Sequence, residues 1–165
     1  MDQTNLAHET LTLKRVFSAS IERVFDAWTK AEILAQWFGP VGFSIISAEN
    51  KLTVGGEYEI VILSPDKNEI THRGEYVDIT PPDTLVFTWL IENQACGGCD
   101  GETATTLVSL TFTSIENGTE LILTHEKLPS QAAYDGHQFG WQGSFDSLAD
   151  LLTQQETNLW RGTLS

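Results

Sequence analysis

The sequence predicts an α+β domain in which one curved antiparallel sheet of seven strands packs against a long C-terminal helix. Three observations lead to this fold class. A strand pattern is followed by two short helical patterns, six β segments come next with mostly short turns between them, and a helical stripe of large apolar residues comes last. A chain of 165 residues suits one domain, which we place at residues 8–156 with tails at 1–7 and 157–165.

The first strand is expected at residues 8–17, where Leu11 and Leu13 supply the apolar content. The period changes immediately afterwards. Ser20 can cap a helix, because Phe25 and Trp28 follow it at helical spacing.

A second short helix is predicted directly after the first. Thr29-Lys30-Ala31-Glu32 has the pattern of a capping box, in which the hydroxyl and the carboxylate satisfy free backbone N–H groups. Ile33, Leu34 and Trp37 continue the apolar pattern, and Gly39-Pro40 is expected to end the helix.

Six β segments follow, with turn sequences such as Pro81-Pro82-Asp83 and Glu116-Asn117-Gly118 between them. The intervals are mostly short and hold no helical apolar pattern, which favours antiparallel neighbours over βαβ units. Gly55-Gly56 and Gly74 are expected at bends or bulges of a curved sheet. The expected strands are 43–49, 56–63, 69–79, 84–91, 105–113 and 119–126.

The last segment returns to a helical period. Its apolar stripe consists of Trp141, Phe145, Leu148 and Leu152. The helix can begin as early as Ser130 and run to about residue 156, although glycines at 136, 140 and 143 argue against its first half.

Composition excludes several function classes. Nine Lys and Arg against 23 Asp and Glu give a net charge of −14, which disfavours binding to nucleic acid or to an anionic membrane surface. No window is apolar enough for a membrane-spanning helix, and the first residues lack the pattern of a secretory signal. We therefore expect a cytoplasmic protein.

Several short stretches of the sequence, taken in chain order, resemble those of the activator of Hsp90 ATPase homologues, a family of the START/Bet v 1-like (SRPBCC) superfamily. The resemblance extends from about Leu11 to Leu152. The matching stretches are Val24-Phe25-Asp26-Ala27-Trp28-Thr29, Trp37-Phe38-Gly39-Pro40, Gly55-Gly56, Gly74-Glu75-Tyr76, Leu85-Val86-Phe87-Thr88-Trp89, Gly118-Thr119-Glu120-Leu121, Thr124-His125-Glu126 and Gly140-Trp141.

The resemblance implies a helix-grip fold, in which the C-terminal helix closes a deep apolar cavity over the sheet, and a ligand-binding role more often than a catalytic one. Eukaryotic activators carry an additional N-terminal domain that makes much of the chaperone contact, and only about ten residues precede the first apolar strand position here. Chaperone activation is therefore not carried over. The residues expected to line the cavity are Trp37, Phe38, Tyr76, Phe87, Trp89, Trp141 and Phe145.

Several of these aromatic residues have two interpretations. Trp37 and Phe38 either plug the core at a helix end or form one rim of the ligand entrance. Tyr76 and Trp89 need hydrogen-bond partners if they are buried, and either a ligand oxygen or a buried water can supply one.

Cys96-Gly97-Gly98-Cys99 has the spacing of a redox or metal motif, but it lies between two predicted strands in a Gly-rich acidic stretch. It lacks the helix that lowers a redox thiol's pKa and the second ligand pair that structural zinc needs. A plain loop, an opportunistic disulfide and a metal or redox site all remain open.

His125 and His137 have the chemistry of an acid–base pair, yet neither shares a recognisable motif with a Ser or Cys nucleophile. The alternative is a hydrogen bond that seats the helix on the sheet. No catalytic residue, metal ligand or cofactor is therefore assigned, and an enzyme such as a cavity-type cyclase or hydrolase ranks last.

The leading hypothesis is a protein that binds a small hydrophobic or aromatic molecule between the sheet and the C-terminal helix. The second is a protein-interaction or co-chaperone-like module whose partner recognises the acidic surface. The sequence leaves open whether the protein is a monomer or a homodimer.

Overall fold

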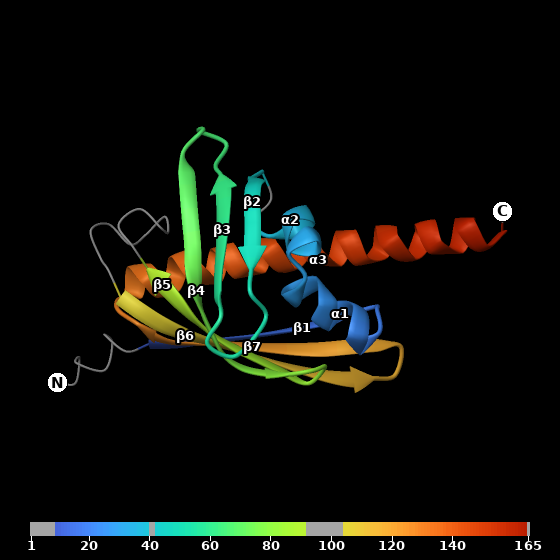
Figure 1. The fold of residues 1–165 in the computed structure, drawn as a ribbon, viewed down its shortest axis with the longest axis horizontal. Helices are drawn as coiled ribbons and strands as arrows, with labels where there is room; N and C mark the ends of the chain where they lie inside the picture. Colours follow the sequence, from blue (N-terminus) through green and yellow to red (C-terminus); the bar gives the residue numbers. More distant parts are fainter. Residues whose placement is uncertain (1–8, 40–41, 92–103, 165) are drawn as a thin grey trace.

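The computed structural model describes the backbone of residues 9–39, 42–91 and 104–164, and the side chains within 10–39, 42–90 and 104–153. Its strands form one antiparallel sheet in the order β1-β7-β6-β5-β4-β3-β2. Helix α3 runs along one face of the sheet and projects beyond it at its C-terminal end (Figure 1). The elements are β1 Glu9–Phe17, α1 Ile21–Thr29, α2 Ala31–Trp37, β2 Ser44–Asn50, β3 Glu57–Leu63, β4 Glu69–Thr80, β5 Thr84–Ile91, β6 Ala104–Ile115, β7 Gly118–Leu128 and α3 Gln131–Leu164.

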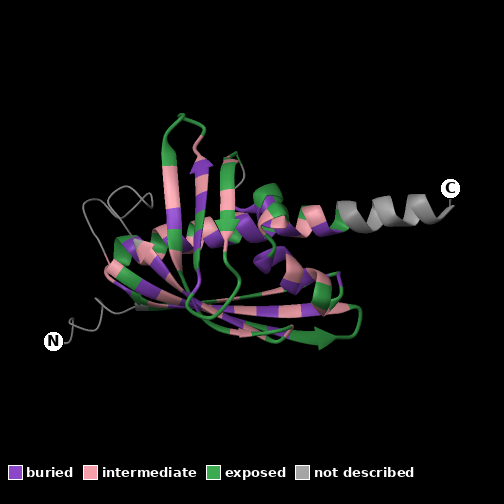
Figure 2. Cartoon of the chain, in the orientation of Figure 1, coloured by how far each residue is buried: buried purple, intermediate pink, exposed green. Residues whose placement is uncertain are grey.

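The predicted fold class is confirmed, and each expected strand lies within two residues of its expected ends. The strand positions could be predicted because apolar and polar residues alternate along the strands. In β3, Tyr58, Ile60 and Ile62 point inward and are buried, while Glu57 and Glu59 are exposed. Figure 2 shows the resulting bands of buried and exposed residues along the strands.

The apolar stripe of α3 faces the core as predicted, with Trp141, Phe145, Leu148 and Leu152 all buried. The helix is nevertheless longer than expected. It is continuous from Gln131 to Leu164 and passes through all three glycines. Burial of the stripe outweighs the propensity cost of glycine, which is only about 1 kcal/mol per residue.

The predicted start of α1 is confirmed, because the Ser20 side chain accepts a hydrogen bond from the Arg23 N–H. The predicted capping box at Thr29 is wrong. Thr29 is the last residue of α1, and its hydroxyl donates to the Phe25 carbonyl at 3.0 Å. Lys30 takes the N-cap position of α2 without a side-chain bond. A threonine hydroxyl inside a helix commonly bonds to the carbonyl four residues earlier, and Thr29 does so here instead of capping α2.

Gly74 lies where the sheet bends sharply between β4 and β5. A Cβ atom at this position would overlap the Thr88 carbonyl oxygen and come within 2.7 Å of the Tyr58 hydroxyl. The glycine therefore allows the β5 backbone to approach β4 on the inner side of the sheet, in agreement with its predicted role at a bend.

Two glycine-to-alanine changes should have opposite effects on stability. Gly74→Ala should lower the free energy of unfolding by about 2–3 kcal/mol, because backbone has to move to admit the methyl group. Gly140→Ala should raise it by about 0.5–1 kcal/mol, since nothing lies within 4 Å of a Cβ there and alanine favours helix. Urea denaturation of both variants checks this, and a Gly74→Ala protein as stable as the parent would contradict the close approach.

Candidate functional site

An aromatic chamber lies between the sheet and the helices. A cavity of about 20 Å³ remains at its centre, which is little more than the space of one small solvent molecule. Eight side chains from α1, α2, β3, β4 and β5 enclose it. They are Trp28, Leu34, Phe38, Tyr58, Ile60, Tyr76, Phe87 and Trp89.

All seven residues predicted to line a cavity are buried, but the structure divides them into two groups. Phe38, Tyr76, Phe87 and Trp89 line the chamber. Trp37, Trp141 and Phe145 lie behind Trp28, with ring centroids 4.8, 5.9 and 6.3 Å from it. The three therefore support the wall from outside the cavity.

Two tryptophans tie α3 to the sheet through histidines. Trp141 Nε1 donates to His125 Nδ1 at 3.1 Å, and Trp89 Nε1 donates to His137 Nε2 at 3.0 Å. Each histidine therefore carries its proton on the other nitrogen. His137 Nδ1–H faces the Ala133 carbonyl at 2.8 Å. These bonds are the helix-seating contacts expected as the alternative to acid–base chemistry.

His125 has a second partner in Thr106. The Thr106 hydroxyl donates to the Trp89 carbonyl at 2.7 Å, so it accepts from His125 Nε2–H, also at 2.7 Å. The chain of bonds thus joins β5, β6, β7 and α3. Every ring nitrogen of His125 and His137 has a partner, and both residues are buried, so neither is available for proton transfer to a substrate in this arrangement.

Burial keeps His72, His125 and His137, which lie around the chamber, neutral. It lowers the pKa of His72 to about 3, with a smaller contribution from the charge of His137. Burial also lowers the pKa of His125 well below its ordinary value and lowers that of His137, whose bond to the Ala133 carbonyl opposes the shift. Within the part of the chain that the structure describes, no group of three or more His, Cys, Asp and Glu side chains could hold a metal ion.

The expected partner of the Trp89 indole, a ligand oxygen or a water, is wrong, because this N–H donates to His137 Nε2. The Tyr76 hydroxyl accepts from Asn50 Nδ2 at 3.1 Å, and the expected acceptor for its own O–H is not tested. Both partners come from elements far away in sequence, so composition and periodicity carried no signal for them.

Two other buried nitrogens have no hydrogen-bond partner among the described residues. They are Trp28 Nε1 and His72 Nδ1. Trp28 lines the cavity, and His72 stacks on the cavity residue Trp89 with centroids 4.5 Å apart. A buried polar group without a partner costs about 1–3 kcal/mol, which makes these atoms candidates for ligand contacts. Sequence analysis missed both residues as site residues, although the helical spacing of Trp28 did predict its burial.

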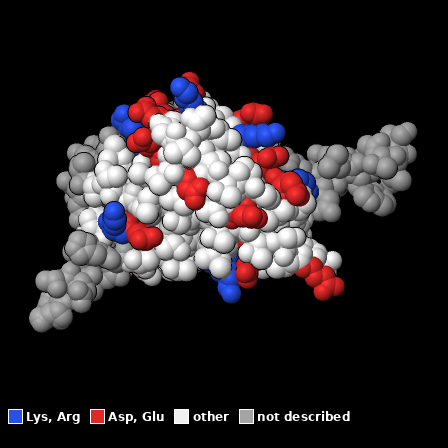
Figure 3. Space-filling view, turned by 60° about the horizontal axis from the view of Figure 1, so that its bottom comes forward, with Lys and Arg blue, Asp and Glu red and all other residues white. Residues whose placement is uncertain are grey.

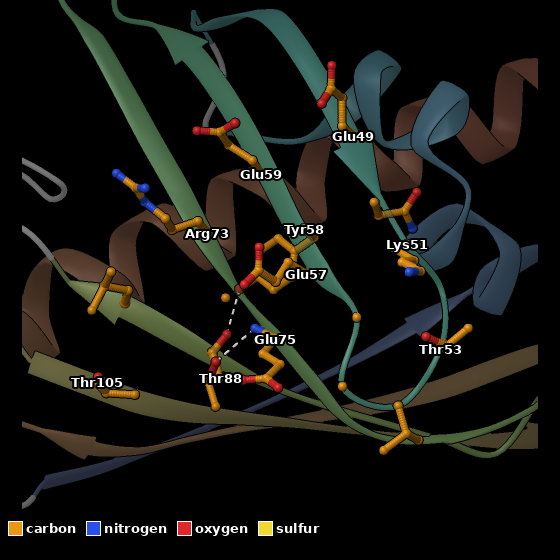
Figure 4. Close-up of a pocket in the computed structure, with 16 residues that line it drawn as sticks. Glu49, Lys51, Thr53, Glu57, Tyr58, Glu59, Arg73, Glu75, Thr88 and Thr105 are labelled. Carbon is orange, nitrogen blue, oxygen red and sulfur yellow. Dashed lines mark hydrogen bonds between the residues drawn. The ribbon is translucent and has the colours of Figure 1, made fainter.

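A second, larger hollow lies on the opposite face of the sheet (Figure 4). This outer groove has a volume of about 1080 Å³ and is open to solvent. Its walls come from the β2–β3 turn and from the outward side chains of β3, β4, β5 and β6. Glu57, Glu59 and Glu75 are exposed in it.

Cys96 and Cys99 lie outside the described residues, so the three interpretations of that motif are not tested. None of the described helices combines the length and the apolar composition needed to cross a bilayer.

The fold and the aromatic chamber define a helix-grip protein of the Bet v 1-like class. Within that class, the chain belongs to the family described as "Activator of Hsp90 ATPase homolog 1-like protein", whose pattern it matches over residues 18–153. The predicted resemblance is therefore confirmed.

Solved structures agree with this assignment. A protein from Chromobacterium violaceum is 27% identical, with a TM-score of 0.75 over 87% of this chain and 96% of its own. The AHSA1 protein of Silicibacter pomeroyi is 25% identical, with a TM-score of 0.76 over 89% of this chain and 99% of its own. A protein from Nitrosomonas europaea, 23% identical with a TM-score of 0.74 over 90% and 96% of the two chains, shares the fold. No curated protein matches the sequence.

Proposed function

We infer that the protein binds a small, predominantly aromatic molecule that carries at least one hydrogen-bond acceptor, and that the aromatic chamber is the binding site. One observation carries this proposal. A donor, Trp28 Nε1, is buried in the wall of an apolar cavity, and no described residue accepts a hydrogen bond from it. Ligand sites commonly combine an apolar lining with a few polar groups that select the orientation, and the Bet v 1-like fold supports such a role.

The chamber has to expand to admit a ligand, because about 20 Å³ is far below the volume of an aromatic molecule. Phe38 is the side chain best placed to move. It lies at the C-cap of α2, and its ring packs against the rings of Trp37, His72, Trp89 and Trp141. A phenyl ring forms no conventional hydrogen bond, so its rotation breaks none and widens the chamber where the ring now lies.

Burial of the ligand's apolar surface in the chamber determines the approximate affinity. Burial of ~300 Å² of apolar ligand surface contributes ~7 kcal/mol at ~25 cal/mol per Å² before association costs are subtracted. Expansion of the chamber reduces this further. We therefore expect dissociation constants that are micromolar or weaker.

Removal of the unpaired donor should weaken binding without weakening the fold. In Trp28→Phe, the dissociation constant for the aromatic alcohol naphthol should rise about fivefold to tenfold, the worth of one hydrogen bond. The stability of the free protein should stay nearly constant, because the variant loses indole packing but also loses the cost of an unpaired N–H. Calorimetric titration and urea denaturation measure the two effects.

Trp37→Phe is the matched control. Its indole donates to the Ala27 carbonyl at 2.9 Å and does not line the cavity. This variant should lose about 1–2 kcal/mol of stability and should bind naphthol as the parent does. Equal affinities in the parent and in Trp28→Phe would contradict the assigned contact, and a parent protein that binds no naphthol would contradict the proposed function. Native mass spectrometry of the freshly purified protein then shows whether any small molecule is retained.

A further inference from the structure

The sheet opens between β4 and β5. Their pairing runs from Thr80 with Thr84 to Tyr76 with Phe87. Beyond that point, residues 69–75 of β4 continue to pair with β3, and residues 88–91 of β5 continue to pair with β6. The two strands stay in contact where Gly74 meets the Thr88 carbonyl and diverge beyond it (Figure 1), and no backbone ladder joins them among the described residues of this stretch.

Three contacts at this opening replace the missing ladder. The Tyr58 hydroxyl donates to the Thr88 carbonyl at 2.7 Å, and the Glu75 N–H donates to the Thr88 hydroxyl at 2.9 Å (Figure 4). The rings of His72 and Trp89 stack across the opening, with an interplanar angle of 24°. The Tyr58 hydrogen bond and the stacking of His72 on Trp89 are both made by side chains. They can therefore break and re-form while the strands keep their other partners.

Tyr58 lies on the boundary between the two hollows. It lines both the chamber and the outer groove. Its cross-strand partner in β4 is Gly74, which has no side chain to share the space. The ring of Tyr58 is thus the part of the wall that closes the bend where β5 approaches β4.

We propose that the ligand enters the chamber from the outer groove through the opening between β4 and β5, and that Tyr58 is the gate. This proposal rests on the binding function inferred above. The groove also limits the class of ligand, because its carboxylates outnumber its cationic groups and repel anions. The protein as a whole has a net charge of −14, and acidic side chains also outnumber basic ones on the face shown in Figure 3. A neutral or cationic aromatic molecule fits this entrance. The charged groups of the groove are Glu49, Glu57, Glu59 and Glu75 against Lys51 and Arg73.

The decisive experiment compares Tyr58→Phe with Thr119→Val. Each substitution removes one hydroxyl that donates to a backbone carbonyl, that of Thr88 at 2.7 Å and that of Ala19 at 2.8 Å, but Thr119 lines neither the chamber nor the outer groove. In stopped-flow measurements with naphthol, Tyr58→Phe should raise the association and dissociation rates by about fivefold each, the factor expected for one hydrogen bond. The dissociation constant should stay nearly constant. Thr119→Val should leave both rates unchanged, and equal rates in all three proteins would overturn the gate.

A ligand-free measurement separates the gate from the proposed function. Diethyl pyrocarbonate acylates neutral imidazole, so it reports exposure of His72 when the opening widens. Modification of His72, mapped by mass spectrometry, should be about fivefold faster in Tyr58→Phe than in the parent. Modification of His125, which is fully buried, should not accelerate. Parallel acceleration at both histidines would indicate global unfolding and count against the gate. If the parent binds no naphthol, the binding function fails while the His72 rates still test the gate.

Charged analogues of the probe test the ligand class. At low ionic strength, naphthylmethylamine should associate faster than naphthol, and naphthoate more slowly, with the three rates converging as salt is added. Faster association of naphthoate would overturn the assignment of the acidic groove as the entrance.

Discussion

Lowering the pH from about 7 to about 5 should destabilise the protein by roughly 4–6 kcal/mol, because three histidines that are buried as neutral rings must be protonated in the unfolded chain. His72, His125 and His137 each have a folded-state pKa below the ordinary value. Their full contribution is present above the unfolded pKa of ~6.5 and is lost as the pH falls toward the folded pKa values. Three such groups give a limiting slope of ~4 kcal/mol per pH unit.

A steep loss of stability that begins near pH 6.5 is the signature of the histidines, because histidine is the side chain whose ordinary pKa lies in this range. Urea denaturation at a series of pH values measures the slope directly.

His72→Phe is the control for this prediction. The ring keeps its stacking on Trp89, and the unpaired Nδ1 disappears together with one titrating group. The slope should fall by about a third, or ~1.4 kcal/mol per pH unit, while stability near pH 8 changes little. A variant with the slope of the parent would show that His72 does not take up its proton on unfolding.

His125→Ala should lower the free energy of unfolding by about 4 kcal/mol at neutral pH. The substitution opens a cavity at a fully buried position and removes the partner of two groups. The Trp141 indole loses its acceptor, and the Thr106 hydroxyl loses its donor. The affinity for naphthol should change much less, because His125 does not line the chamber cavity.

A double-mutant cycle isolates the bond between His125 and Trp141. His125→Leu leaves the Trp141 indole without its acceptor, Trp141→Phe leaves His125 Nδ1 without its donor, and the double variant leaves neither of these two groups unpaired. The contact of His125 with Thr106 is lost in both His125→Leu proteins, so its effect cancels in the cycle. The double variant should therefore be more stable than the sum of the single effects predicts by about 1–2 kcal/mol. Additive effects would mean that the bond contributes nothing beyond packing. Thermal and urea denaturation of all four proteins supply the comparison.

Local sequence patterns were sufficient to predict most of the fold. Strand alternation, as in Tyr58, Ile60 and Ile62, identifies inward faces from the chain alone because successive side chains point to opposite sides of a sheet. The stripe from Trp141 to Leu152 identifies the α3 face in the same way. Both are properties of neighbouring residues, so the element order and the buried aromatic set could be predicted.

Competition between local partners limited the prediction of helix ends. Thr29 had a plausible capping role ahead of it and a carbonyl behind it, and the sequence contains no measure of which is closer. The predicted length of α3 was wrong for a related reason. The glycines at 136, 140 and 143 lower the intrinsic helix propensity, but burial of the helix against the sheet outweighs that cost.

The sequence by itself determined the family, the element order and which aromatic side chains are buried, because these depend on period and residue type. Tertiary structure alone decided that the chamber is nearly filled, that Trp28 and His72 keep unpaired nitrogens, and that Tyr58 faces Gly74 beside an opening in the sheet. These features depend on packing density, on strand register and on hydrogen bonds between residues far apart in the chain, such as Trp89 and His137, which are 48 residues apart. Such contacts form only when distant segments meet, so no local pattern encodes them.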